Sequence, residues 1–121
     1  DTTLYSPLYK QIVGNGLIGR FILDVYKIKL THEIKSRTFD EFNKSFTLNA
    51  QLSESLKKYC INNHDILWDD EEFKYSKLWF ESRIKAEIAD LYFGESYFYE
   101  VINQDNSDIV KSLQIIKENK I

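Results

Sequence analysis

The sequence predicts an all-α fold, a single compact domain of about six helices spanning residues 1–121. One proline and four glycines in 121 residues suit long helices better than many short strands. Apolar residues recur at helical spacing along most of the chain. The chain contains no repeat, low-complexity tract or long linker, and its length suits one hydrophobic core.

Two helices are predicted on either side of a glycine break at 14–16. Ser6 and Pro7 are typical of a helix start, because serine can cap and proline fits the first turn. The helical pattern resumes at Leu17 and continues to about Lys35. Its apolar stripe consists of Leu17, Phe21, Val25 and Ile28.

Two further helices are predicted to begin at capping residues, Thr38 and Asn49. The second of them is expected to end at 62–65. Their predicted inner faces are Phe39, Phe42 and Phe46 in the first helix, and Leu52, Leu56, Tyr59 and Cys60 in the second.

The longest predicted helix covers residues 69–93 and forms the centre of the fold. Four acids at 69–72 lie where the positive end of a helix dipole favours negative charge. Two apolar stripes follow, as expected of a helix that is buried on two faces. One stripe is Phe73, Phe80, Ile84, Ile88 and Leu91, and the other is Tyr75, Trp79, Ala86, Ala89 and Phe93.

Gly94 is predicted to stop or kink this central helix. A short aromatic helix is expected next, and Ser107 is predicted to cap the last helix. The apolar residues of these two helices are Tyr97, Phe98, Val101 and Ile102, and then Ile109, Val110, Leu113 and Ile116.

Composition excludes several classes of function. A net charge of −3, from 19 acids and 16 bases, gives no electrostatic reason to expect binding to nucleic acid or an anionic membrane. No apolar run approaches the ~20 residues of a membrane span, and no signal peptide is visible. Because the chain starts at Asp1 rather than methionine, we expect a fragment of a longer protein. A lone Cys60 rules out an internal disulfide without fixing the compartment.

Residues 14–19 read G-N-G-L-I-G, the glycine spelling of a dinucleotide-binding turn. Glu33 even lies 19 residues beyond Gly14, near the expected place of the ribose-binding acid. That motif requires a strand before the glycines, however, and the flanking patterns here are helical. We interpret the stretch as a break between helices, with a nucleotide-dependent enzyme as a remote alternative. Gly19 then lies inside a helix at a cost of up to ~1 kcal/mol relative to alanine, which predicts a close helix contact there.

Other motifs are incomplete. His32-Glu33 begins a zinc-peptidase helix, but Ser36 stands where the second histidine is required. We interpret Cys60 and His64 as a buried apolar cysteine and a C-terminal histidine, and not as a thiolate–imidazole pair or half a metal site. We therefore predict no catalytic residue, cofactor or metal. The remaining partial matches are Ser55/Lys58 and Ser82/Lys85, spaced as S-x-x-K, and 105–108, which lacks the central glycine and closing glutamate of a calcium loop.

Five segments together resemble one family, in order and spacing: the carboxy-terminal processing (tail-specific) serine peptidases, in the branch typical of Bacteroidetes. The resemblance covers nearly the whole chain and lies in the family's C-terminal region. The segments are D-T-T-x-Y-S-P-L-Y at 1–9, G-L-I-G-R-F-I-L-D-V-Y at 16–26, F-D-E-F-N-K-S-F at 39–46, D-E-E-F-K-Y-S-K at 70–77, and the stretch from I-K-A-E-I-A-D-L-Y-F-G to D-I-V-K-S-L at 84–113.

The resemblance implies an extracytoplasmic, periplasmic parent enzyme with a PDZ domain and a Ser–Lys pair that cuts protein substrates near their C-termini. The family's nucleophile motif matches nothing in this chain, so no catalytic residue carries over. The expected function is a non-catalytic C-terminal helical domain that packs on the protease core or on a second subunit. The alternative is a free-standing helical module that binds a partner protein. The predicted interface is the aromatic cluster of Tyr92, Phe93, Tyr97, Phe98 and Tyr99, although these side chains could equally pack internally.

Overall fold

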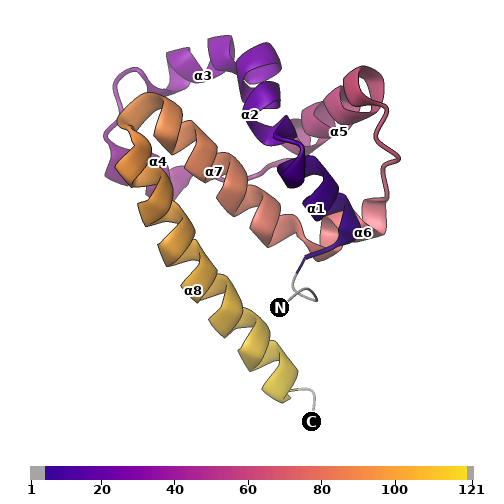
Figure 1. The fold of residues 1–121 in the computed structure, drawn as a ribbon. Helices are drawn as coiled ribbons and strands as arrows, with labels where there is room; N and C mark the ends of the chain where they lie inside the picture. The colour runs from indigo at the N-terminus through magenta and orange to yellow at the C-terminus, as the bar shows by residue number, and fades with distance from the viewer. Residues whose placement is uncertain (1–4, 120–121) are drawn as a thin grey trace.

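A computed structural model describes residues 5–119 and confirms the all-α prediction. The described residues form seven helices, counting the continuous segment 17–34 as one, and no strand (Figure 1). In order, the elements are α1 (Pro7–Gly14), α2 (Leu17–Phe21), the π-helical turn η2 (Ile22–Tyr26), α3 (Lys27–Ile34), α4 (Phe39–Ser45), α5 (Ala50–His64), α6 (Asp70–Tyr75), α7 (Lys77–Phe93) and α8 (Glu95–Asn119).

Four predicted helix starts are confirmed by side-chain caps. Ser6, Thr38, Asn49 and Asp69 each accept a hydrogen bond from the backbone N–H three residues later. Each cap satisfies a donor that the first helical turn leaves without a partner. The predicted break at 14–16 is also confirmed, because Gly16 adopts a left-handed φ of 69° between α1 and α2.

α7 is the central helix of the core. Phe80, Ile84 and Ile88 are completely buried along it, as one predicted stripe requires. Trp79, Ala86 and Ala89 of the second stripe are buried as well, so α7 is covered on more than one face. Two assignments were wrong: Leu91 and Tyr75 are exposed.

The predicted stripe in 17–34 is correct in its first half and wrong in its second. Leu17 and Phe21 are buried, but Val25 is 51% exposed and Ile28 is 80% exposed. The π-helical turn between Ile22 and Tyr26 is the reason. A π turn holds more residues than an α turn. The next fully buried residue after Ile22 is therefore Leu30, eight residues later. Two α-helical turns would instead span about seven residues.

The single helix predicted over 69–93 is wrong, because the chain breaks at Ser76 into α6 and α7. The buried Ser76 hydroxyl accepts a 2.8 Å hydrogen bond from the Ser6 backbone N–H and donates to the Ser6 Oγ at 3.0 Å. One turn earlier, the Glu72 carboxylate accepts from the Leu8 N–H at 2.8 Å. The junction thus caps the start of α1, where a carboxylate is favoured by the helix dipole.

The two helices predicted after Gly94 are one continuous helix, α8, so Ser107 is not a cap. The polar residues at 105–108 lie inside α8 instead. Asp105 forms an ion pair with Lys85 of α7 at 3.0 Å, and both side chains are largely shielded from solvent. Asp105 therefore attaches α8 to α7 rather than ending a helix.

The predicted helix contact at Gly19 is present, but it is not a close one. A Cβ at this position would lie 3.4 Å from Glu87 Oε2 on α7. This is an ordinary contact distance to the end of a flexible side chain, so the packing of α2 on α7 leaves room for a methyl group at position 19.

Candidate interaction surface

α7 and α8 form an antiparallel hairpin that turns at Gly94, whose φ of 119° is accessible mainly to glycine. Trp79 and Ile109 each lie fifteen residues from Gly94 and are both buried. α8 has 25 residues and α7 has 17, which at 1.5 Å per residue correspond to about 37 and 25 Å. The difference in length is about 12 Å. Figure 1 shows that the end of α8 extends past the start of α7.

The extended end of α8 carries exposed apolar side chains. We call residues 110–116 the α8 tip. Within it, Val110, Leu113, Ile115 and Ile116 are between 37% and 57% exposed. Toward the hairpin, by contrast, Val101 and Ile109 are buried.

The α8 tip continues the apolar seam of the hairpin. Ile109, Leu113 and Ile116 follow one another at intervals of four and three residues, the spacing with which one helix packs along another. Ile109 lies on the buried part of this seam, and the next two positions pass beyond the start of α7. The α8 tip therefore has the residue spacing of a helix that packs on another helix, but no helix covers it among the described residues.

The predicted aromatic interface divides into inward-facing and outward-facing members. Phe93 packs edge-on against Phe39 at 5.7 Å, and the Tyr92 hydroxyl donates to the Lys27 carbonyl at 3.1 Å. Phe98 lies under the Arg83 guanidinium at 5.1 Å. These three rings are half-buried against the core.

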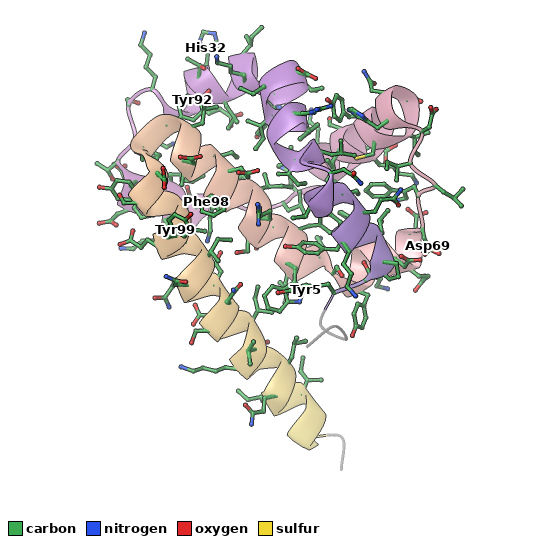
Figure 2. The ribbon with its side chains drawn as sticks, viewed as in Figure 1. Tyr5, His32, Asp69, Tyr92, Phe98 and Tyr99 are labelled. Atoms are coloured by element: carbon green, nitrogen blue, oxygen red, sulfur yellow. The ribbon has the colours of Figure 1, made fainter. Side chains whose placement is uncertain are left out.

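Tyr97 and Tyr99 are the exposed members of that cluster, at 37% and 55%. Tyr97 still lies 4.5 Å from Phe39, centroid to centroid, and Tyr99 packs edge-on against Phe98. Figure 2 shows Tyr92, Phe98 and Tyr99 near the turn between α7 and α8, away from the α8 tip. The interface prediction is thereby restricted to two residues, and it stays a prediction.

Cys60 and His64 have surroundings that agree with a structural interpretation. Cys60 is completely buried, and burial raises the pKa of its thiol to about 11. The thiol is therefore protonated at neutral pH, whereas a cysteine nucleophile acts as the thiolate. The His64 ring packs edge-on against Tyr59 at 4.9 Å.

The Ser–Lys spacings are not hydrogen-bonded pairs in the structure. Lys85 is engaged by Asp105 at 3.0 Å, while the buried Ser82 hydroxyl has no hydrogen-bond partner. In the other pair, Ser55 is half-buried and Lys58 is exposed on α5. The geometry brings neither lysine to its serine as a base.

The remaining motifs have helical surroundings. The segment before Gly14 is α1 and not a strand, so the dinucleotide motif lacks the context it requires. His32 and Glu33 are exposed on α3. Among the side chains that the structure describes, residues 5–116, there is no cluster of three or more potential metal ligands. Within the same part of the chain, no helix has the length and apolar character needed to cross a membrane.

The fold and the α8 tip define a class of protein: an all-α domain with an exposed apolar helix end. Residues 8–94 match the model of a family described as Family of unknown function (DUF8443), and the chain belongs to this family. The matched residues include α1 to α7 and end at Gly94, so α8 lies outside them. Neither the curated proteins nor the solved structures include a significant match.

The sequence identified Val110, Leu113 and Ile116 as apolar residues of the last helix but did not predict that they are exposed. Val110, Leu113 and Ile116 follow the same spacing as buried positions, so the pattern does not distinguish a covered face from an uncovered one. The difference depends on where α7 begins, and that depends on the break at Ser76.

Proposed function

We propose that this chain is the non-catalytic C-terminal helical domain of a periplasmic carboxy-terminal processing serine peptidase, and that its α8 tip packs on the protease core of the same polypeptide. The peptidase assignment rests on the resemblance of five segments in register. The docking site rests on one observation, the apolar face of α8 that continues past the start of α7.

The size of the α8 tip favours a core within the same polypeptide over a separate partner. Its four apolar side chains are about half exposed. Leu113 and Ile116 lie on the seam, whereas Val110 and Ile115 flank it on opposite sides, so a partner must form a groove around the tip to cover all four. Burying the remainder of each then contributes about 1 kcal/mol. Even before the entropy cost of association is subtracted, a total of about 4 kcal/mol corresponds to a Kd no tighter than millimolar between free proteins. A tethered core has an effective concentration in the millimolar range, so the same contact suffices within one chain. Stable interfaces between separate proteins bury about 1,200–2,000 Å², far more than four side chains supply.

In this proposal the domain contributes no catalytic group. It supports the enzyme by covering apolar surface on the core and by shaping access to the active site for protein substrates. Tyr97 and Tyr99 would extend the contact to a second subunit, because they are exposed at the opposite end of the hairpin.

The test is hydrogen exchange in the full-length protein compared with residues 1–121 alone. We expect slower exchange at 110–116 in the full-length protein, because docking suppresses local opening. Replacing Leu113 and Ile116 by glutamine should abolish this protection and lower peptide-cleavage activity or thermal stability. Leu67→Gln is the matched control, since Leu67 is 91% exposed on a loop away from α8.

Two results would contradict the proposal. One is identical exchange at 110–116 in the full-length and isolated forms. The other is an upstream reading frame that encodes no PDZ-containing peptidase. Capture of a third protein by the isolated domain, lost in the glutamine double variant, would favour the free-standing binding module instead.

A further inference from the structure

A pocket of about 340 Å³ lies beside the π-helical turn, between the 17–34 helix, the end of α4 and the start of α5. This volume falls within the range of small-ligand sites. Its floor contains four buried apolar side chains, Leu30, Ile34, Phe42 and Leu52, while polar groups make up more of the exposed lining. We call it the π-helix pocket.

The wide turn η2 shapes one wall of the π-helix pocket. Val25 and Tyr26, the last two residues of the turn, line it. By shifting the buried face to Leu30 and Ile34, the turn places both of these side chains in the floor. π turns are rare, and many of them occur at functional sites. The position of η2 in the wall of this pocket therefore favours a ligand site here.

The rim on the α3 side carries more positive than negative charge. Lys29, Glu33 and Arg37 line it at intervals of four residues, giving two cations and one anion. None of the three belongs to either of the ion pairs formed among the described side chains of residues 5–116. The Arg37 guanidinium makes a long 3.3 Å hydrogen bond to the Ser45 hydroxyl and also interacts electrostatically with the Glu41 carboxylate. One hydrogen bond leaves most of its five donors for another acceptor.

The remaining polar groups are neutral donors and acceptors. Thr47, Gln51 and Ser55 line the rim opposite α3. Burial, and then the nearby Glu33 carboxylate, raise the pKa of the Tyr26 phenol. The Tyr26 hydroxyl therefore stays protonated at neutral pH and can donate a hydrogen bond.

We propose that the π-helix pocket binds a small organic carboxylate with an apolar body. The apolar body would lie on the floor of Leu30, Phe42 and Leu52, and the carboxylate would face Arg37 and Lys29. A pure hydrocarbon would leave the charged rim unused. An arginine fork matches the two oxygens of a carboxylate. This inference does not rest on the proposed peptidase assignment.

The test is an NMR titration of the whole chain with phenylacetate, followed through the methyl groups of Leu30 and Leu52. Benzyl alcohol, which has a similar ring and no charge, is the comparison ligand. Concentrations up to about 10 mM suffice to detect a millimolar Kd. We expect saturable shifts at both leucines with phenylacetate and much weaker ones with benzyl alcohol.

Substitutions of the rim cations then test which side chains bind the carboxylate of the ligand. Arg37→Gln and Lys29→Gln should each raise the Kd for phenylacetate about three- to tenfold, the range expected for losing one charged hydrogen bond at an exposed site. Lys35→Gln is the matched control, because Lys35 is an exposed cation at the end of the same helix and does not line the pocket. It should leave the Kd unchanged.

Three outcomes would overturn the proposal: no saturable shift at Leu30 or Leu52, equal binding of benzyl alcohol, or an equal loss of affinity in all three variants. An unchanged amide spectrum of each variant without ligand establishes that a weakened Kd reflects the rim and not misfolding.

Discussion

Glu87 places a carboxylate in a confined position between two helices. Its Oε2 lies 3.4 Å from where a Cβ on Gly19 would stand, and it also lines a small pocket with Ile22 and Leu23. Burial raises the pKa of the Glu87 carboxyl, partly offset by Arg83 and reinforced by Asp90. Ionised Glu87 is therefore less favourable in the folded chain than in the unfolded chain.

Glu87→Gln should consequently stabilise the domain at pH 7. Because the folded-state pKa lies above the ordinary value of 4.5, the wild type binds this proton more tightly when folded. That contribution to stability is complete below pH 4.5 and is lost as the pH rises through the folded-state pKa. Urea unfolding at pH 7 and pH 4 should show a gain for Glu87→Gln only at pH 7. Glu54→Gln, at an exposed position, should change stability by less than about 0.5 kcal/mol at either pH. A gain for Glu87→Gln of equal size at both pH values would refute the assignment to ionisation.

At the scale of elements, the α6–α7 junction is the feature on which the arrangement of the hairpin depends. Ser76 and Glu72 both bond to the first turn of α1, from positions more than sixty residues away in sequence. This contact directs α6 toward α1 and lets α7 start at Lys77. The α8 tip is uncovered because α6 does not continue along the path of α7.

Ser76→Ala should destabilise the domain by about 1–3 kcal/mol, because the Ser6 N–H is buried and would lose its acceptor. The free energy of unfolding in urea measures this directly. Ser107→Ala removes the same hydroxyl from an exposed position on α8 and should change stability by less than about 0.5 kcal/mol. Equal effects of the two substitutions would mean that the Ser6–Ser76 contact contributes nothing specific.

At the scale of the whole molecule, stability and interaction are expected to depend on different apolar residues. Phe80 is completely buried at the centre of the core, between the rings of Tyr9 and Phe73 at centroid distances of 5.0 and 5.1 Å. Leu113 and Ile116 of the α8 tip are substantially exposed. Mutations at the two places should therefore separate folding from docking.

Phe80→Ala should cost about 3–5 kcal/mol in the isolated chain. The double substitution Leu113→Gln with Ile116→Gln should cost less than about 1 kcal/mol there, because glutamine keeps good helix propensity and little packing is lost. Thermal and urea unfolding of residues 1–121 compare the two. A double variant as unstable as Phe80→Ala would show that the α8 tip is part of the core.

Local chemistry in the sequence was sufficient to predict where most helices begin. Ser6, Thr38, Asn49 and Asp69 cap helices through bonds to residues three positions away, and Gly94 ends α7 through its own backbone freedom. The inward side chains of α5 and most of those of α7 were also correct, because helical periodicity is itself a local property. The all-α class follows from these local signals together.

Only the tertiary structure decided the features that matter for function. The break at Ser76 coincides with a bond to Ser6, and the ion pair between Asp105 and Lys85 holds α8 against α7. Both contacts join residues that are distant in the sequence. The role of each of these residues therefore depends on a partner elsewhere in the fold, and local sequence patterns do not reveal that partner. The π-helical turn and the pocket beside it likewise arise from packing, because the wide turn returns Leu30 and Ile34 to the core. The sequence by itself determined an all-α domain and its helix caps, whereas the exposed α8 tip and the π-helix pocket exist only because of long-range contacts.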